Sequence, residues 1–323
     1  MKGKKKGNKK LRKILLVVIG ILVAFILFSV INHRIKMKQE EEFLTPIGQM
    51  IEVDGNQMCV YSEGSGDKTL VFMSGLGTVS PILDFKSLYS LLSDDYRIAV
   101  VEKYGYGFSD QVDKARNVDL MLEDTRAALR GVGIEGPYIL CPHSLSGLEA
   151  LYWAQTYPDE VEAIIGLDMD VPESYDYLKI GTPHILLTKL MHSLVDLGIG
   201  RFVSDSAVLP PGNSLSEEER RTYVALFNRN YMNIDIAREY ESIHESAVLV
   251  GSNKKPDVPM LLFVSDGTGG TGMDTATWRS VVRNYADDMS NVTIIELDCS
   301  HYLHHYESER ISEEIDSFLQ GKH

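Results

Sequence analysis

The sequence predicts an α/β protein built on a doubly wound, mainly parallel sheet, with a helical insertion and one apolar helix at the N-terminus. Two observations support the sheet: short apolar runs bounded by turn residues recur along the chain, and helical patterns separate several of them. Parallel strands need long crossover connections, which are usually helices, so this alternation favours a sheet covered on both faces. A third observation, an uncharged apolar run over residues 14–31, predicts the N-terminal helix.

The first 38 residues are expected to form a cytoplasmic basic segment and a transmembrane anchor. The apolar run has 18 residues, close to the ~20 that a membrane-spanning helix requires. Eight Lys or Arg residues precede it and three follow it, with no acid among them. This asymmetry favours a cytoplasmic N-terminus and an extracytoplasmic body. A cleaved signal peptide is the alternative, but its apolar region is shorter and ends in a small-x-small site, so we expect a single-pass protein of the cell membrane.

The rest of the chain is acidic. Eleven of the 32 basic residues lie in the first 38 positions, which leaves 21 basic against 46 acidic residues, a formal charge of −25. Binding to phosphate backbones is driven by basic surface, so nucleic acid is not expected as a partner.

Three cysteines cannot form a closed disulfide framework. We expect Cys59, Cys141 and Cys299 to be buried and unreactive, because an oxidising exterior discourages exposed thiols. A Cys141–Cys299 bridge is the alternative.

The predicted elements follow a short charged stalk at residues 39–42. Residues 51–61 are expected to form a hairpin around Asp54-Gly55, a favoured two-residue turn. Strands are then expected at 69–73, 97–101, 137–141, 161–167, 260–264 and 292–297. Helices are expected at 118–129, 148–157, 275–285 and 308–319. These elements assign residues 39–170 and 258–323 to one core domain.

Residues 171–257 lack convincing strand alternation and are expected to form a helical cap. Ser216 and Glu219 match a capping box, in which the serine caps a helix and the glutamate reaches back to it. Tyr223, Leu226, Phe227 and Tyr231 then suggest one apolar face at helical spacing.

A turn of small residues separates the strand expected at 137–141 from the helix expected at 148–157. It reads Pro142-His143-Ser144-Leu145-Ser146-Gly147. A strand, a tight turn with one serine at its apex and a helix form the geometry that lifts a hydroxyl out of a sheet. A serine that merely caps the following helix is the alternative, but it does not explain the packed small residues.

Three further segments, each placed after an expected strand, support the interpretation of this turn. They are Ser74-Gly75-Leu76-Gly77 after an early strand, Glu102-Lys103-Tyr104-Gly105-Tyr106-Gly107-Phe108-Ser109-Asp110 after the next, and Asp298-Cys299-Ser300-His301-Tyr302 after the last. With these four motifs in this order, residues 51–319 resemble the α/β-hydrolase fold superfamily, particularly its cap-bearing, proline-iminopeptidase-like and esterase-like members. Pro142 stands where the family usually has glycine, and Ser74 where it has histidine.

The resemblance implies a catalytic triad. Ser144 matches the nucleophile and His301 the base that a weakly nucleophilic hydroxyl needs. Asp266, after the strand at 260–264, gives the chain order Ser, Asp, His of the superfamily and is expected as the acid. Asp168, after the strand at 161–167, is the alternative.

The resemblance also implies an oxyanion hole and a turn. The backbone N–H groups of Leu76 and Leu145 are expected to form the oxyanion hole. The 102–110 segment is expected to be a structural turn at the pocket floor. His304 and His305 beside His301 raise a metal cluster as an alternative, but no carboxylate or cysteine has the usual zinc spacing, so no metal is expected.

We therefore expect a membrane-anchored serine hydrolase that cleaves an ester or amide bond through an acyl-enzyme on Ser144, without a cofactor. The substrate would be a small ester, an acyl compound or a peptide. Peptidase members of the family bind the substrate amine with cap carboxylates, for which this cap offers Glu217, Glu218, Glu219, Glu239 and Glu241. A non-catalytic binding module at the cell surface is the alternative from another class, because the fold also hosts functions that do not use the triad.

Overall fold

The computed structural model describes residues 2–178, 182–212 and 214–321. Its centre is an eight-stranded sheet with the order β1-β2-β4-β3-β5-β6-β7-β8, in which β2 pairs antiparallel with β1 and β4 and all other pairs are parallel. The strands are β1 (Gln49–Val53), β2 (Asn56–Glu63), β3 (Thr69–Met73), β4 (Arg97–Glu102), β5 (Tyr138–Pro142), β6 (Val161–Leu167), β7 (Met260–Val264) and β8 (Val292–Glu296). The predicted α/β class is confirmed.

Local sequence accounts for these strands. Asp54 and Gly55, with φ of 48° and 77°, form the turn between β1 and β2, because two positive φ angles match the twist of a tight hairpin. Every residue of β3, β5 and β7 is buried. Strands covered on both faces read as continuous apolar runs, which is why these three were visible in the sequence.

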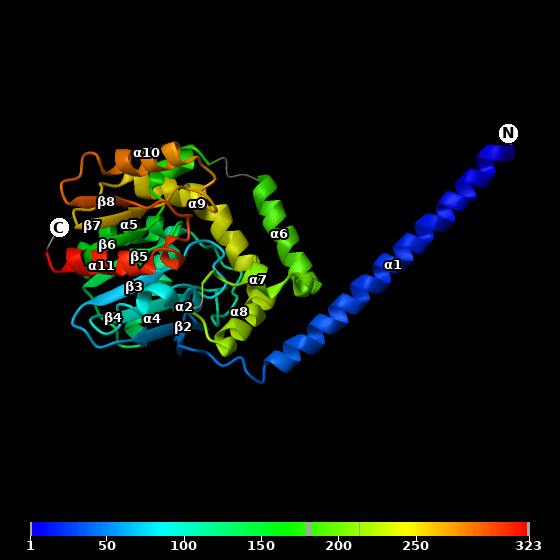
Figure 1. Ribbon diagram of the computed structural model, residues 1–323, viewed down its shortest axis with the longest axis horizontal. Helices are drawn as coiled ribbons and strands as arrows, with labels where there is room; N and C mark the ends of the chain where they lie inside the picture. Colours follow the sequence, from blue (N-terminus) through cyan, green and yellow to red (C-terminus); the bar gives the residue numbers. More distant parts are fainter. Residues whose placement is uncertain (1, 179–181, 213, 322–323) are drawn as a thin grey trace.

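Helices cover both faces of the sheet (Figure 1). One apolar core includes Val118 and Leu122 of α4 (Val118–Gly131), Leu151 of α5 (Ser146–Thr156) and Trp278 of α10 (Thr275–Ala286). A second core includes Ile82 of α2 (Pro81–Asp84), Leu88 of α3 (Lys86–Tyr89), and Ile311 and Ile315 of α11 (Ser308–Leu319). Two cores separated by one sheet are the arrangement of a doubly wound fold.

A helical cap is inserted between β6 and β7. Its helices are α6 (Thr182–Asp196), α7 (Asp205–Val208), α8 (Glu217–Asn230) and α9 (Ile234–Ser252), with 3-10 turns η2 (Pro172–Asp176) and η3 (Ile199–Phe202). The capping box is present: the Glu219 N–H donates to Ser216 Oγ at 3.3 Å, and the Ser216 N–H donates to Glu219 Oε2 at 2.8 Å. In Figure 1, α9 lies against the core while α6 lies on the outer side of the cap, toward α1.

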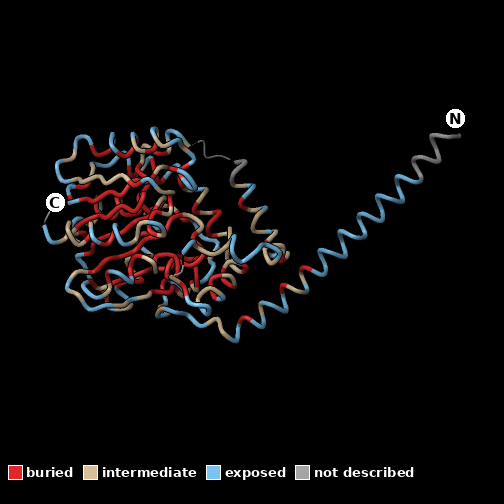
Figure 2. Tube along the Cα trace, in the orientation of Figure 1, coloured by how far each residue is buried: buried red, intermediate tan, exposed pale blue. Residues whose placement is uncertain are grey.

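Helix α1 (Lys2–Glu40) projects from the body, and its described residues are exposed along most of its length (Figures 1 and 2). The part from Lys10 to Glu40 is long and apolar enough to cross a membrane. Its C-terminal end is held by the cap: Ser29 Oγ donates to the carbonyl of Leu197 at 2.6 Å, and Arg201 Nη1 donates to Glu40 Oε1 at 2.5 Å. Helix α1 and the cap are therefore in direct contact.

The three cysteines carry free thiols. Cys59 and Cys141 are buried as expected, whereas Cys299 is half-buried, and no Cys141–Cys299 bridge forms. Burial raises the pKa of all three thiols, that of Cys299 to about 12. They are therefore poor nucleophiles, because the thiolate is the reactive form.

Candidate active site

Ser144 lies on the turn between β5 and α5 with a φ of 54°. A non-glycine residue in this left-handed region is strained and must be held by its surroundings. The neighbouring Ser146 does this: its hydroxyl contacts the carbonyls of Met73 and His143 at 2.7 and 2.8 Å. The His143 N–H adds a 2.9 Å bond to the Met73 carbonyl. The turn is thus fastened to the end of the adjacent strand β3.

Small residues around Ser144 are required by close packing. A Cβ on Gly75 would lie 2.7 Å from Ser144 Cβ, and a Cβ on Gly147 would lie 2.1 Å from the Asp170 carbonyl oxygen. Any side chain at either position would collide with the chain opposite. Pro142 ends β5 in register with Met73, so proline in place of the usual glycine does not prevent the turn.

His301 follows β8 and points its Nδ1 at a carboxylate. Nδ1 lies 2.6 Å from Asp168 Oδ2, and the His301 N–H donates to the Thr268 carbonyl at 2.8 Å. Gly270 lies against the imidazole, where a Cβ would come within 1.9 Å of the ring. Backbone and glycine together fix the ring, and a carboxylate on Nδ1 leaves Nε2 as the nitrogen that can accept a proton.

Asp168 is 1 % exposed and directly follows β6. Besides His301, its carboxylate accepts bonds from the Ser265 N–H at 2.7 Å, the Ser265 hydroxyl at 2.6 Å and Trp278 Nε1 at 2.8 Å. Four donors hold it in one orientation. Sequence reasoning missed Ser265 and Trp278, because they lie 97 and 110 positions from Asp168 in the chain. Ser265 reaches it because β7 pairs with β6, and Trp278 reaches it from α10.

The expectation that Asp266 contacts the base is corrected by this geometry. Asp266 is only partly buried, and its Oδ1 accepts the Thr268 N–H at 2.8 Å and the Thr268 hydroxyl at 2.6 Å. These two bonds lower the pKa of its carboxyl. Successive side chains of an extended chain point in opposite directions, so Ser265 faces Asp168 while Asp266 faces away. The alternative acid, Asp168, is the one that meets His301.

Leu76 and Leu145 line the same pocket as Ser144. Among the described residues, neither backbone N–H has a hydrogen-bond partner. The next amide along, the Gly77 N–H, donates to the Tyr106 hydroxyl at 3.1 Å. The loop that carries Leu76 is therefore tied to the 102–110 segment.

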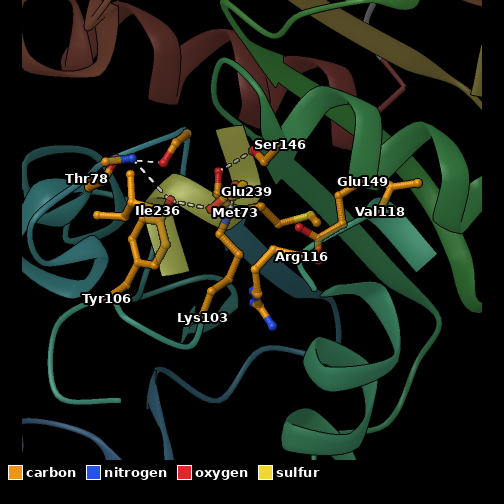
Figure 3. Close-up of polar contacts among 12 residues, drawn as sticks. Met73, Thr78, Lys103, Tyr106, Arg116, Val118, Ser146, Glu149, Ile236 and Glu239 are labelled. Atoms are coloured by element: carbon orange, nitrogen blue, oxygen red, sulfur yellow. Dashed lines mark hydrogen bonds and ion pairs between the residues drawn. The ribbon is translucent and has the colours of Figure 1, made fainter. Parts of the chain in front are cut away.

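A buried polar network links that segment to the cap (Figure 3). The Tyr106 hydroxyl donates to Glu239 Oε2 at 2.5 Å, and Lys103 Nζ donates to Glu239 Oε1 at 2.6 Å. Burial and the neighbouring Glu239 raise the pKa of Tyr106 well above its usual value, so the hydroxyl keeps its proton. Glu239 of α9 thereby supports, through Tyr106, the loop beside Ser144.

Glu102 makes contacts that hold the backbone of the turn at residues 102–110, as expected for a structural turn. Its carboxylate accepts the Phe108 N–H at 2.7 Å and the Ser80 hydroxyl at 3.0 Å. Gly107 lies so close that a Cβ there would be 2.0 Å from this carboxylate. Burial raises the pKa of Glu102 to about 7.

A pocket of about 300 Å³ brings Ser144 and His301 together beneath the cap. The core contributes Leu76, Leu145, Asp170 and Tyr302, and the cap contributes Tyr175, Leu178, Tyr240 and Ile243. The wall combines leucine and isoleucine side chains with hydroxyl, imidazole and carboxylate groups, and a concave site of this kind can bind a small molecule.

One carboxylate faces this pocket, that of Asp170, whose Oδ2 accepts the Tyr175 hydroxyl at 2.5 Å. Burial raises the pKa of Asp170. The five cap glutamates considered for amine binding do not line the pocket; Glu219, Glu239 and Glu241 instead pair with lysines. Amine recognition by these cap carboxylates is therefore not supported by their positions.

Asp84, His304 and His305 form a buried cluster whose ligand atoms lie within 4.8 Å of one another. The two imidazole Nε2 atoms lie 3.0 and 3.3 Å from the Asp84 carboxylate. Burial by itself raises the pKa of Asp84, but the two histidines lower it well below its usual value. Both Nδ1 atoms lack partners among the described residues, whereas metal-binding histidines are normally oriented through that nitrogen. Hydrogen bonding to Asp84 explains the cluster.

Comparisons with known proteins support the fold. No family model matches the chain. The uncharacterized protein YbdG of Bacillus subtilis is 36 % identical over 310 residues, which cover 94 % of this chain and 95 % of YbdG. The solved epoxide hydrolase VrEH1 of Vigna radiata has a TM-score of 0.64 at 17 % identity, covering 84 % of this chain and 97 % of its own. A putative lipase from Acinetobacter baumannii has a TM-score of 0.63 at 15 % identity, covering 90 % and 96 %.

Proposed function

Because the chain has the α/β-hydrolase fold and belongs to one family with the uncharacterized YbdG, we propose that it is a membrane-anchored serine hydrolase acting on a carboxylic ester. The observation that carries the proposal is the 2.6 Å contact between His301 Nδ1 and Asp168 Oδ2, with His301 and Ser144 on one pocket. The epoxide hydrolase likeness concerns fold alone; the chemistry is argued from this chain's own residues.

Ser144 Oγ attacks the substrate carbonyl carbon, and His301 Nε2 takes the hydroxyl proton as the new C–O bond forms. Asp168 accepts the Nδ1–H and stabilises the imidazolium. The N–H groups of Leu76 and Leu145 receive the negative oxygen. His301 returns its proton to the departing alkoxide, the C–O bond to the alcohol breaks, and water then hydrolyses the acyl-enzyme by the same steps.

The charge of the pocket favours an ester substrate over a peptide with a free amine. A substrate ammonium needs a facing carboxylate, but none of the five cap glutamates lines the pocket, and Asp170 is engaged by Tyr175. The raised pKa of Asp170 further disfavours its charged form.

The membrane anchor is supported by the length and composition of α1 and by its N-terminal basic cluster. These features favour a cytoplasmic N-terminus and a hydrolase domain on the other side of the cell membrane.

Labelling with a fluorophosphonate probe tests the chemistry. We expect the full chain to be labelled and Ser144→Ala to lose labelling completely, because the probe reacts only with an activated serine. Ser206→Ala, an exposed cap serine, is the matched control and should label normally. An unlabelled but folded wild-type chain would overturn the proposal and favour a non-catalytic binding module.

A further inference from the structure

The outer part of the cap exposes an apolar surface beside the anchor helix. Leu186, Leu187 and Leu190 lie at helical spacing on one face of α6, and Phe202 and Val203 lie at the end of η3; these five residues are 45 to 62 % exposed. We call them the cap leucine surface. Elements α6 and η3 contact each other. Exposed apolar groups of this size on neighbouring elements mark an interaction site.

The anchor helix indicates what covers this surface. The Phe202 ring packs against Phe25 of α1, with ring centroids 5.4 Å apart. Phe25 belongs to the uncharged run that ends at Ile31. Six residues of helix correspond to roughly 9 Å, so Phe25 lies well inside the end of the apolar run. A residue packed on Phe25 lies at the same depth.

Polar contacts fix the cap in this position. Ser29 donates to the Leu197 carbonyl, Arg201 pairs with Glu40, and Arg201 Nε donates to His33 Nδ1 at 3.0 Å. Glu40 also lies 3.6 Å from Arg229 of α8. Since these contacts run from Ser29 to Glu40, the cap cannot slide away from the C-terminal end of the apolar run without breaking them.

We propose that the cap leucine surface is embedded in the bilayer leaflet that faces the hydrolase domain. This inference rests on the proposed membrane anchor. An interfacial helix buries its apolar face ~5–10 Å into the boundary between headgroups and acyl chains, which matches the depth set by the Phe25–Phe202 contact. Exposed Arg34, Lys36 and Lys38 follow the apolar run on α1, where basic side chains reach anionic headgroups.

The docked cap also defines a substrate class. Leu178 lines the catalytic pocket only four positions before Thr182, where α6 begins. The neighbouring Tyr177 is exposed, and aromatic residues favour the membrane interface. An acyl ester that partitions into the bilayer would therefore meet the pocket wall directly.

Fluorescence quenching tests the docking. Two variants of the full chain, Leu187→Trp and Phe202→Trp, are made separately. Each is measured in phosphatidylcholine and phosphatidylglycerol vesicles whose acyl chains are either brominated or plain. Leu120→Trp is the control, since Leu120 is partly exposed on α4, away from α6 and α1 in Figure 1. The native Trp153 and Trp278 are fully buried and give a constant background.

We expect brominated chains to lower the added emission at positions 187 and 202 by roughly threefold, as for groups at acyl-chain depth, and to leave position 120 unchanged. If brominated chains leave the emission at positions 187 and 202 unchanged, as at position 120, the proposed docking is wrong. The same result is expected if a second copy of the chain covers α6. Chains that do not float with the vesicles would overturn the anchor and the docking together. Neither outcome depends on Ser144.

The substrate class has its own measurement. The triple variant Leu186→Ser, Leu187→Ser, Leu190→Ser should lower the ratio of vesicle-borne long-chain ester hydrolysis to soluble short-chain ester hydrolysis by roughly fivefold. An unchanged ratio would overturn the assignment of bilayer esters.

Discussion

At the scale of single residues, the contacts of His301 and Asp168 define the geometry of the site. The Asp168 carboxylate is surrounded by Ser265, Trp278 and His301, so it has little freedom to rotate. Its backbone φ of 51° is itself strained. Strain that the surroundings maintain is typical of functional positions, and both Ser144 and Asp168 carry it.

Asp168→Asn should lower kcat by roughly 10³-fold or more, because an amide cannot stabilise the imidazolium and favours the wrong tautomer. Asp266→Asn should leave kcat near the wild-type value, since the Asp266 carboxylate accepts hydrogen bonds from Thr268 and not from His301. Initial rates on a soluble ester compare the two variants. A large loss in Asp266→Asn with little effect of Asp168→Asn would reverse the assignment of the acid.

At the scale of elements, the end of β4 and the turn after it are joined by Glu102. Its carboxylate holds the Phe108 N–H and the hydroxyl of Ser80, the residue before α2. Glu102 is fully buried. Because the pKa of its carboxyl is raised, the stability of this junction depends on pH.

Stability should therefore fall as pH rises. The unfolded carboxyl titrates at about 4.3, whereas the pKa of Glu102 in the fold is about 7. Between these values the folded chain retains a proton that the unfolded chain has lost, so folding becomes less favourable with increasing pH by roughly 4 kcal/mol for this group. Glu102→Gln removes the effect.

Thermal unfolding is monitored by circular dichroism from pH 4.5 to 8. The Tm difference between Glu102→Gln and wild type at each pH measures the pH dependence that Glu102 contributes. Glu52→Gln, an exposed position on β1, is the matched control. A Tm difference for Glu102→Gln that does not grow with pH would contradict the expected coupling.

At the scale of the whole molecule, the cap is attached to the core through charge as well as apolar contact. Lys103 and Glu239 are 4 % and 1 % exposed, and they join the turn after β4 to α9. Breaking a buried ion pair leaves one charge without its partner, which costs much more than removing both charges.

Lys103→Met should lower the free energy of unfolding by roughly 3–5 kcal/mol. The double variant Lys103→Met, Glu239→Gln should recover much of this loss, because the glutamine oxygen can still accept the Tyr106 hydroxyl and neither charge of the pair is left without its partner. Denaturant titration of the three chains checks the coupling. Additive losses in the double variant would show that the pair does not act as a unit.

The sequence by itself determined the order of the main strands and helices, the cap, the turn that carries Ser144 and the apolar N-terminal helix. These features depend on local patterns: continuous apolar runs for buried strands, Ser216 and Glu219 for a helix start, and small residues around Ser144. Neighbouring residues in the chain create them, so they are visible without coordinates.

Only the tertiary structure decided which aspartate meets His301, that the five cap glutamates stay outside the pocket, and which part of the cap touches α1. Asp168 and Asp266 both follow strands at the same edge of the sheet, and the direction of each side chain separates them. Glu239 is neutralised by Lys103, 136 positions away, and Phe202 meets Phe25 across the cap. Such contacts join distant segments through packing, and no local pattern in the chain encodes them.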